Sequence, residues 1–297
     1  MILNKRVPIS FRFNEIKQEL IIVICITVIC DFLPDVYMKI DKLPDIPISI
    51  AAILGTAISI LLSFRVNQSF GWWWEARQIW GSIINDSRNF TLQLQLYVKN
   101  DPETVKRVAL RQAAWAYALA QSLRKQDPFK HTEELLAKAD REKLSQQQHV
   151  PLAILAVQNE ELKTLHQQNK INDFGLNLMS ETLQRFTDAL GKCERIKNTV
   201  FPRMSADALH ATIYLFAIFL SMPLKLNLVL EVIIITTITM VFFILEKSAK
   251  RLQTPFENLP NDIPMHALSI TIETNIKQLL HEENLPKPAV AELFYAL

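Results

Sequence analysis

Four blocks of apolar residues interrupt an otherwise polar chain: Leu20–Cys30, Ile46–Phe64, Ala208–Leu224 and Leu228–Leu245. A helix needs about 20 consecutive apolar residues to cross a bilayer, with about 17 as a lower limit. The second and fourth blocks meet this length, the third meets it at the margin, and the first is short. We nevertheless expect four spans, because the second block would otherwise cross alone and leave the topology unbalanced. The predicted transmembrane helices cover residues 20–36, 46–66, 206–224 and 228–247.

The polar remainder of the chain carries signals of helices. Asp101-Pro102-Glu103 has the order of a helix start: a cap residue, then proline, then an acid at the positive end of the helix dipole. Pro151 opens a further helix, Asn172–Lys197 has the apolar spacing of one long helix, and another is expected near Ala267–His281. These patterns predict an all-α fold, with a cytoplasmic helical region over residues 70–205 and 250–297. Because no helix breaker follows the second block, its helix should continue into this region.

Charges beside the apolar blocks predict their orientation. Basic residues precede the first block and follow the second and fourth, whereas the connection over residues 31–45 leans acidic. Lysine and arginine are enriched on the cytoplasmic side of membrane proteins. We therefore predict that both termini and the long middle segment are cytoplasmic.

Composition narrows the function. Of the 297 residues 49% are hydrophobic, only 5 are glycine, and the net charge is +2 without a basic stripe, which argues against a nucleic-acid partner. The six histidines lack the spacing of a zinc site, and neither a phosphate-binding glycine loop nor a nucleophile motif occurs. The sequence therefore predicts a protein that is not an enzyme, with no cofactor and no metal site.

The second block contains a stripe of three residues that recur at every fourth position, Thr56, Ile60 and Phe64. Residues four apart share one helix face. The stripe fits a packed apolar face, but it also fits an apolar constriction if copies of the helix surround an axis. Just beyond the block, the tryptophans at 72–74 are typical of residues that anchor a helix at the membrane interface.

Three ordered motifs surround the apolar blocks. They are Phe64 with the pair Trp73-Trp74 nine residues on and Glu75-Ala76-Arg77; Cys193-Glu194-Arg195-Ile196 with Pro202; and Thr254-Pro255-Phe256-Glu257-Asn258 with Asn261-Asp262-Ile263-Pro264. In these residues the chain resembles the bestrophin family of ion channels, in its bacterial form. The resemblance covers nearly the whole chain.

The resemblance implies a single channel subunit over residues 1–297, which assembles as a homopentamer in the bacterial inner membrane and conducts small inorganic ions. It implies that Thr56, Ile60 and Phe64 line the pore neck, that Trp73 and Trp74 support it, and that a second constriction lies near residues 174–178. The bacterial motifs lean toward a monovalent cation such as sodium. A chloride channel of the same family is the alternative.

The chain departs from the family pattern at three places. Trp72 stands where the family has arginine, and Thr56 replaces a bulky apolar residue. The run after Phe256 carries few of the acids that bind calcium in the animal members, so we expect opening without calcium. Two other classes remain open: a secondary transporter, although internal symmetry is missing, and a membrane-anchored scaffold.

Overall fold

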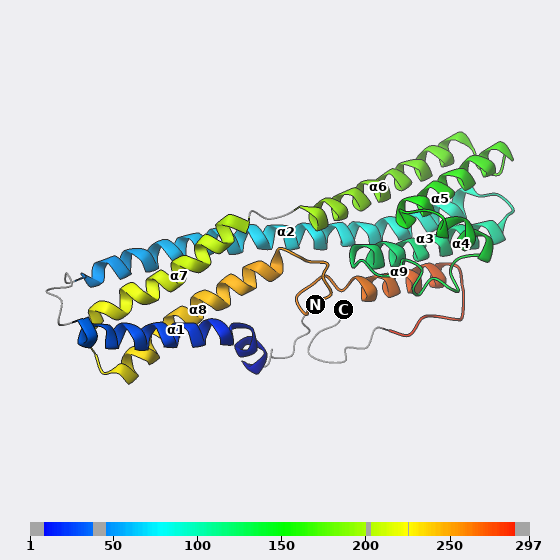
Figure 1. Cartoon of the computed structure of the whole chain (residues 1–297). Coiled ribbons are helices and arrows are strands. Elements are labelled where there is room, and N and C mark those ends of the chain that lie inside the picture. Colours follow the sequence, from blue (N-terminus) through cyan, green and yellow to red (C-terminus); the bar gives the residue numbers. More distant parts are fainter. Residues whose placement is uncertain (1–8, 38–45, 200–202, 225, 289–297) are drawn as a thin grey trace. The chain divides into compact units, whose positions relative to one another are not determined.

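The computed structural model describes residues 9–37, 46–199, 203–224 and 226–288, and over these residues the fold is entirely helical (Figure 1). The helices are α1 (Ile9–Tyr37), α2 (Ile48–Tyr97), α3 (Pro102–Leu123), α4 (Lys138–Ser145), α5 (Val150–Gln167), α6 (Asp173–Asn198), α7 (Arg203–Leu224), α8 (Leu228–Leu252) and α9 (Met265–Leu279). The predicted all-α class is confirmed. The predicted continuation of the second apolar block is also confirmed, because α2 runs unbroken for 50 residues.

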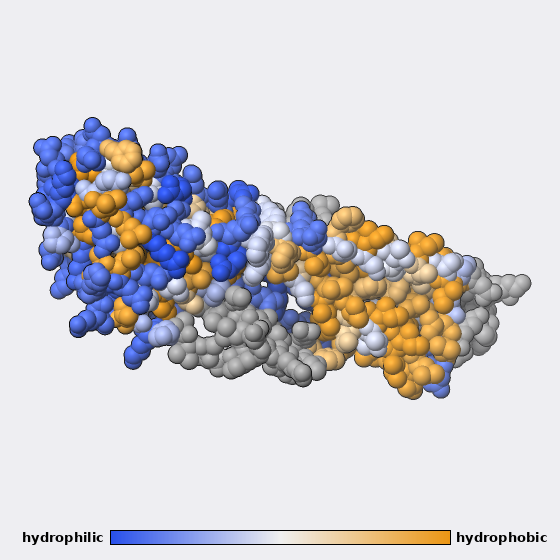
Figure 2. Space-filling model, turned by 180° about the vertical axis from the view of Figure 1, so that it is seen from behind, coloured by the Kyte–Doolittle hydropathy of each residue, from blue (hydrophilic) through white to orange (hydrophobic). Residues whose placement is uncertain are grey.

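The described residues within 5–72 and 200–253 form one compact unit, which contains α1, the first half of α2, α7 and α8. Its core joins residues of all four helices, among them Val23, Ile58, Ile213 and Phe243, which are fully buried. Gly55 permits a close approach of α2 to α7, since a Cβ atom there would lie 3.1 Å from the ring of Phe216. Much of the outer surface of these helices is apolar (Figure 2).

Three helices of the described chain are long and apolar enough to cross a membrane. They are α2, the part of α7 over Asp207–Leu224, and α8. Helix α1 contains the first apolar block, but the residues of α1 whose side chains are described, 13–32, include Glu15, Lys17 and Glu19. The fourth span therefore remains a prediction.

The second unit contains the remaining half of α2 from Trp73, together with α3, α4, α5, α6 and α9. The predicted helix starts are present. The Asp101 side chain accepts the N–H of Thr104 at the start of α3, and the Asn172 side chain accepts the N–H of Gly175 at the start of α6. These caps satisfy backbone donors that would otherwise lack partners at a helix N-terminus.

Candidate functional site: the exposed face of α2

The predicted pore residues lie on one exposed face of α2. Ile60 is 51% exposed and Phe64 is 70% exposed, and Thr56 is exposed as well. Ile58 and Leu62, on the opposite face, are buried in the unit's core. Among the described residues, the three predicted residues thus share a face that lies outside the buried core of their unit.

The same face extends further than the sequence analysis predicted. Ile53, three residues before Thr56, is 68% exposed, and Asn67, three residues after Phe64, is also exposed. Spacings of three and four residues bring these side chains onto one stripe. The stripe therefore runs from Ile53 to Asn67, whose side chain is an amide. Both ends follow the period of an α-helix, so this period is the sequence signal that predicts them.

Hydroxyl groups on this part of α2 are satisfied within the helix. Thr56 Oγ1 donates to the carbonyl of Ala52 at 2.8 Å, and Ser59 Oγ donates to the carbonyl of Gly55 at 2.8 Å. Such bonds to the preceding turn use up the hydroxyl proton. Thr56 consequently presents its methyl group and a weak acceptor, and the stripe from Ile53 to Phe64 behaves as an apolar surface.

Charged residues near the end of the apolar stripe are paired across helices. Arg65 Nη1 of α2 lies 3.8 Å from Glu246 Oε1 of α8, and His210 Nδ1 of α7 lies 2.8 Å from the other oxygen of the same carboxylate. Lys247 of α8 forms a separate pair with Glu19 of α1 at 2.6 Å. The two short pairs link α7 to α8 and α8 to α1 at one end of the unit, and the longer contact brings α2 beside them.

The two tryptophans predicted to support the neck have different environments. Trp73 is partly buried, and its Nε1–H donates to the carbonyl of Asn261 at 2.9 Å. Trp74 is 48% exposed, with its ring centroid 6.5 Å from that of Trp73. Two of the sequence motifs therefore meet through one hydrogen bond, which spacing along the chain does not predict.

Within the segment over residues 254–264, the buried side chain of Asp262 forms a hydrogen bond with the backbone. Asp262 is 1% exposed, and its carboxylate accepts the N–H of Leu259 at 3.0 Å. Burial raises the pKa of Asp262 to about 6, although the backbone N–H donors and the nearby Arg124 work in the opposite direction. Across the described residues, no group of three or more histidine, cysteine or acidic side chains is arranged to hold a metal ion.

The region predicted to form a second constriction begins with an exposed aromatic side chain. Phe174 is 64% exposed and lies edge-on against Tyr97, with ring centroids 6.1 Å apart. Gly175 follows, and a Cβ atom there would lie 2.8 Å from Tyr97. The assignment of this region to a constriction remains a prediction.

A family model of bacterial and fungal bestrophin proteins matches residues 12–278 of the chain. The chain belongs to the bestrophin family. This family is one of ion channels and not of enzymes, so the chain is an ion-channel protein of the membrane.

Relatives of this bestrophin chain cover most of its length. The voltage-dependent anion channel-forming protein YneE of Salmonella typhi is 30% identical over 250 residues, which are 83% of this chain and 81% of the relative. The protein RSc3414 of Ralstonia nicotianae, with the same description, is 25% identical over 303 residues, covering 97% of this chain and 96% of the relative. A bacterial bestrophin homologue from Klebsiella pneumoniae has a similar structure, with a TM-score of 0.83 and 25% identity over 93% of this chain and 100% of that one.

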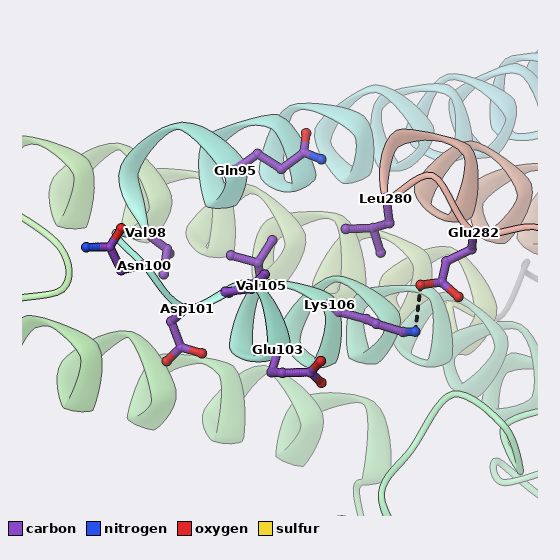
Figure 3. A pocket seen from close by; sticks show the side chains of 10 residues that line it. Gln95, Val98, Asn100, Asp101, Glu103, Val105, Lys106, Leu280 and Glu282 are labelled. Atoms are coloured by element: carbon purple, nitrogen blue, oxygen red, sulfur yellow. Dashed lines mark ion pairs between the residues drawn. The ribbon is translucent and has the colours of Figure 1, made fainter.

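This bestrophin also has a cavity of about 450 Å³ between the end of α2, the start of α3 and the end of α9 (Figure 3). Acidic side chains line it, but the structure pairs several of them. Lys106 bonds Glu282 at 2.6 Å, and a hydrogen bond from Lys170 lowers the pKa of Asp101 to about 2. Two of the three acidic side chains that line the cavity, Asp101 and Glu282, therefore have lysine partners.

Proposed function

We propose that this bestrophin is a homopentameric channel in which Thr56, Ile60 and Phe64 of five α2 helices form an apolar neck. The observation that carries the proposal is the exposed stripe on α2, which the described residues leave uncovered. A ring of such stripes gives a narrow passage that controls ion flow by wetting and dewetting. Membership of an ion-channel family supports this use of the stripe over simple contact with lipid.

Small monovalent ions are the proposed substrates, with chloride foremost. Relatives across several bacteria are described as anion channels. The cation preference that the sequence motifs favoured gains no support from those descriptions, and the neck itself carries no charge that would select a sign. The reversal potential in a potassium chloride gradient across a planar bilayer distinguishes the two signs.

Single-channel recording of the full-length protein tests the neck. Ile60→Ala and Phe64→Ala should raise the conductance, because each removes a large side chain from all five subunits at one level of the pore. Ile233→Ala is the matched control: Ile233 is exposed to a similar degree as Ile60, at 55%, but lies on α8 and not on the α2 stripe. Unchanged conductance in both stripe variants would remove these residues from the pore, and absence of any current from the wild-type protein would refute the channel.

The stoichiometry has its own test. Five subunits of 34.2 kDa amount to about 171 kDa of protein in one detergent-solubilised particle. Light scattering with subtraction of the detergent gives this mass directly. A transporter or a scaffold would not require five subunits, and a monomeric or dimeric mass would exclude the proposed pore.

The proposed topology places both termini on the cytoplasmic side of a bacterial inner membrane. It is tested by single cysteines in a background without Cys25, Cys30 and Cys193. A cysteine at Lys39, which lies outside the described residues, should react with an impermeant thiol reagent added to intact cells, and one at Gln146 should react only after lysis. The reverse pattern would overturn the orientation.

A further inference from the structure

Arg65 follows the last apolar residue of the stripe, yet its charge is withdrawn from the exposed face. Its side chain is 12% exposed, whereas Phe64 before it is 70% exposed. Arg65 Nη1 lies 3.8 Å from Glu246 Oε1, and the side chain of Glu246 is only 9% exposed. The exposed residues one turn after Phe64 are Asn67 and Gln68, neither of which carries a charge.

Glu246 is a buried carboxylate that is surrounded by basic side chains. A buried carboxylate is costly unless cations or hydrogen-bond donors compensate it. Arg65 and His210 face Glu246 from α2 and α7, while the adjacent Lys247 is taken by Glu19 of α1. Among the described residues of this unit, Glu246 therefore supplies the negative charge that neutralises Arg65.

The contact between Arg65 and Glu246 is electrostatic and not a close hydrogen bond. A charge-assisted hydrogen bond between these groups would measure about 2.7 to 2.9 Å, whereas the observed distance is 3.8 Å, and Arg65 Nη1 has no hydrogen-bond partner among the described residues. The helices are thus not locked together by this pair. The main effect of the pair is electrostatic: the positive and negative charges cancel, so the local electrostatic potential is close to zero.

We propose that Glu246 is a specificity-determining residue of the channel: by neutralising Arg65 it keeps the end of the neck free of positive charge and limits the preference for anions. The proposal rests on the proposed pore. In a pentamer a change of one charge per subunit is repeated five times around a narrow passage with low-dielectric walls, which concentrate the field. Each charge within about one Debye length of the ion path, about 8 to 10 Å, then acts on the permeating ion.

Reversal potentials of reconstituted full-length protein, recorded in a salt gradient at one pH, test the proposal. Glu246→Gln removes the counter-charge, so the ratio of chloride to potassium permeability should rise by about threefold or more. Arg65→Gln should lower the ratio, and the double variant should return it to the wild-type value. Because Arg65→Gln tests the same pair from the other side, the proposal remains testable if Glu246→Gln does not fold.

Glu160→Gln is the matched control. Glu160 lies on α5 at an exposed ion pair with Lys143, and its replacement changes the charge of each subunit by the same amount. The control should leave the permeability ratio unchanged. A conducting wild type whose ratio is the same in Glu246→Gln and Arg65→Gln, or a control that shifts the ratio as much, would overturn the role of Glu246 but leave the channel intact. A silent wild type would instead refute the proposed function.

Discussion

Replacement of the buried Asp262 by asparagine should change how the stability of this bestrophin depends on pH. Burial raises the pKa of Asp262 from an ordinary value of 3.8 to about 6 in the folded chain. Between these two values the folded state binds more protons than the unfolded state, so stability falls as the pH rises from about 4 to about 6. Above pH 6 the full cost of burying the charged carboxylate is present.

The size of this cost follows from the shift in pKa. A difference of about two pKa units corresponds to about 3 kcal/mol per subunit, at 1.36 kcal/mol per unit. Asp262→Asn removes this cost at pH 7.5, whereas only about one fifth of the cost is present at pH 4. The asparagine amide also changes the free energy of unfolding, because the site supplies N–H donors. This change does not depend on pH, so it cancels when the difference between variant and wild type at pH 7.5 is compared with the same difference at pH 4.

Thermal unfolding in detergent, followed by tryptophan fluorescence, measures the effect, because the signal includes the fully buried Trp80 and Trp115. The Tm difference between Asp262→Asn and wild type should be more favourable to the variant at pH 7.5 than at pH 4, by about 5 °C. Asp188→Asn, an exposed change of the same charge on α6, serves as the control. A Tm difference that is equal at the two pH values would refute the raised pKa of Asp262.

His266 supplies a test of opposite sign. Burial and the nearby cations lower the pKa of His266 from 6.5 to about 4. The unfolded state then binds more protons between pH 4 and 6.5, so this residue costs stability as the pH falls. His266→Gln should therefore gain relative to wild type at pH 4 and not at pH 7.5. Parallel pH profiles for the Asp262 and His266 variants would contradict at least one of the two assignments.

Three further predictions concern packing and gating. Gly175→Ala should destabilise the chain by about 1 to 3 kcal/mol, because its Cβ would lie 2.8 Å from Tyr97, whereas Gly191→Ala on the same helix has open space and should be neutral or slightly stabilising; thermal unfolding compares them. Trp73→Phe should cost about 1 kcal/mol, since it leaves the Asn261 carbonyl without its donor, and a loss much below this value would show that the bond contributes little. Flux through reconstituted protein should be the same in chelator and in about micromolar free calcium, the range of sensor sites, and a large rise with calcium would contradict the expected calcium independence.

The sequence by itself determined most of the helices of this protein, although α4 had no clear local signal. Apolar blocks of sufficient length, and caps such as Asp101 and Asn172, act within a few residues of the chain, so local composition predicts them. The four-residue spacing of Thr56, Ile60 and Phe64 placed them on one face for the same reason. Ile53 and Asn67 extend this stripe at spacings of three residues, which the four-residue pattern does not contain.

Only the tertiary structure decided which side of α2 is uncovered and which distant residues meet it. An amphipathic stripe indicates that its residues lie together, but the packing of α1, α7 and α8 determines that Ile58 is buried and Ile60 exposed. The bond from Trp73 to Asn261 joins residues 188 positions apart, and Arg65 meets Glu246 across two helices. Such contacts depend on how whole helices pack, and no pattern within a short stretch of sequence contains that information.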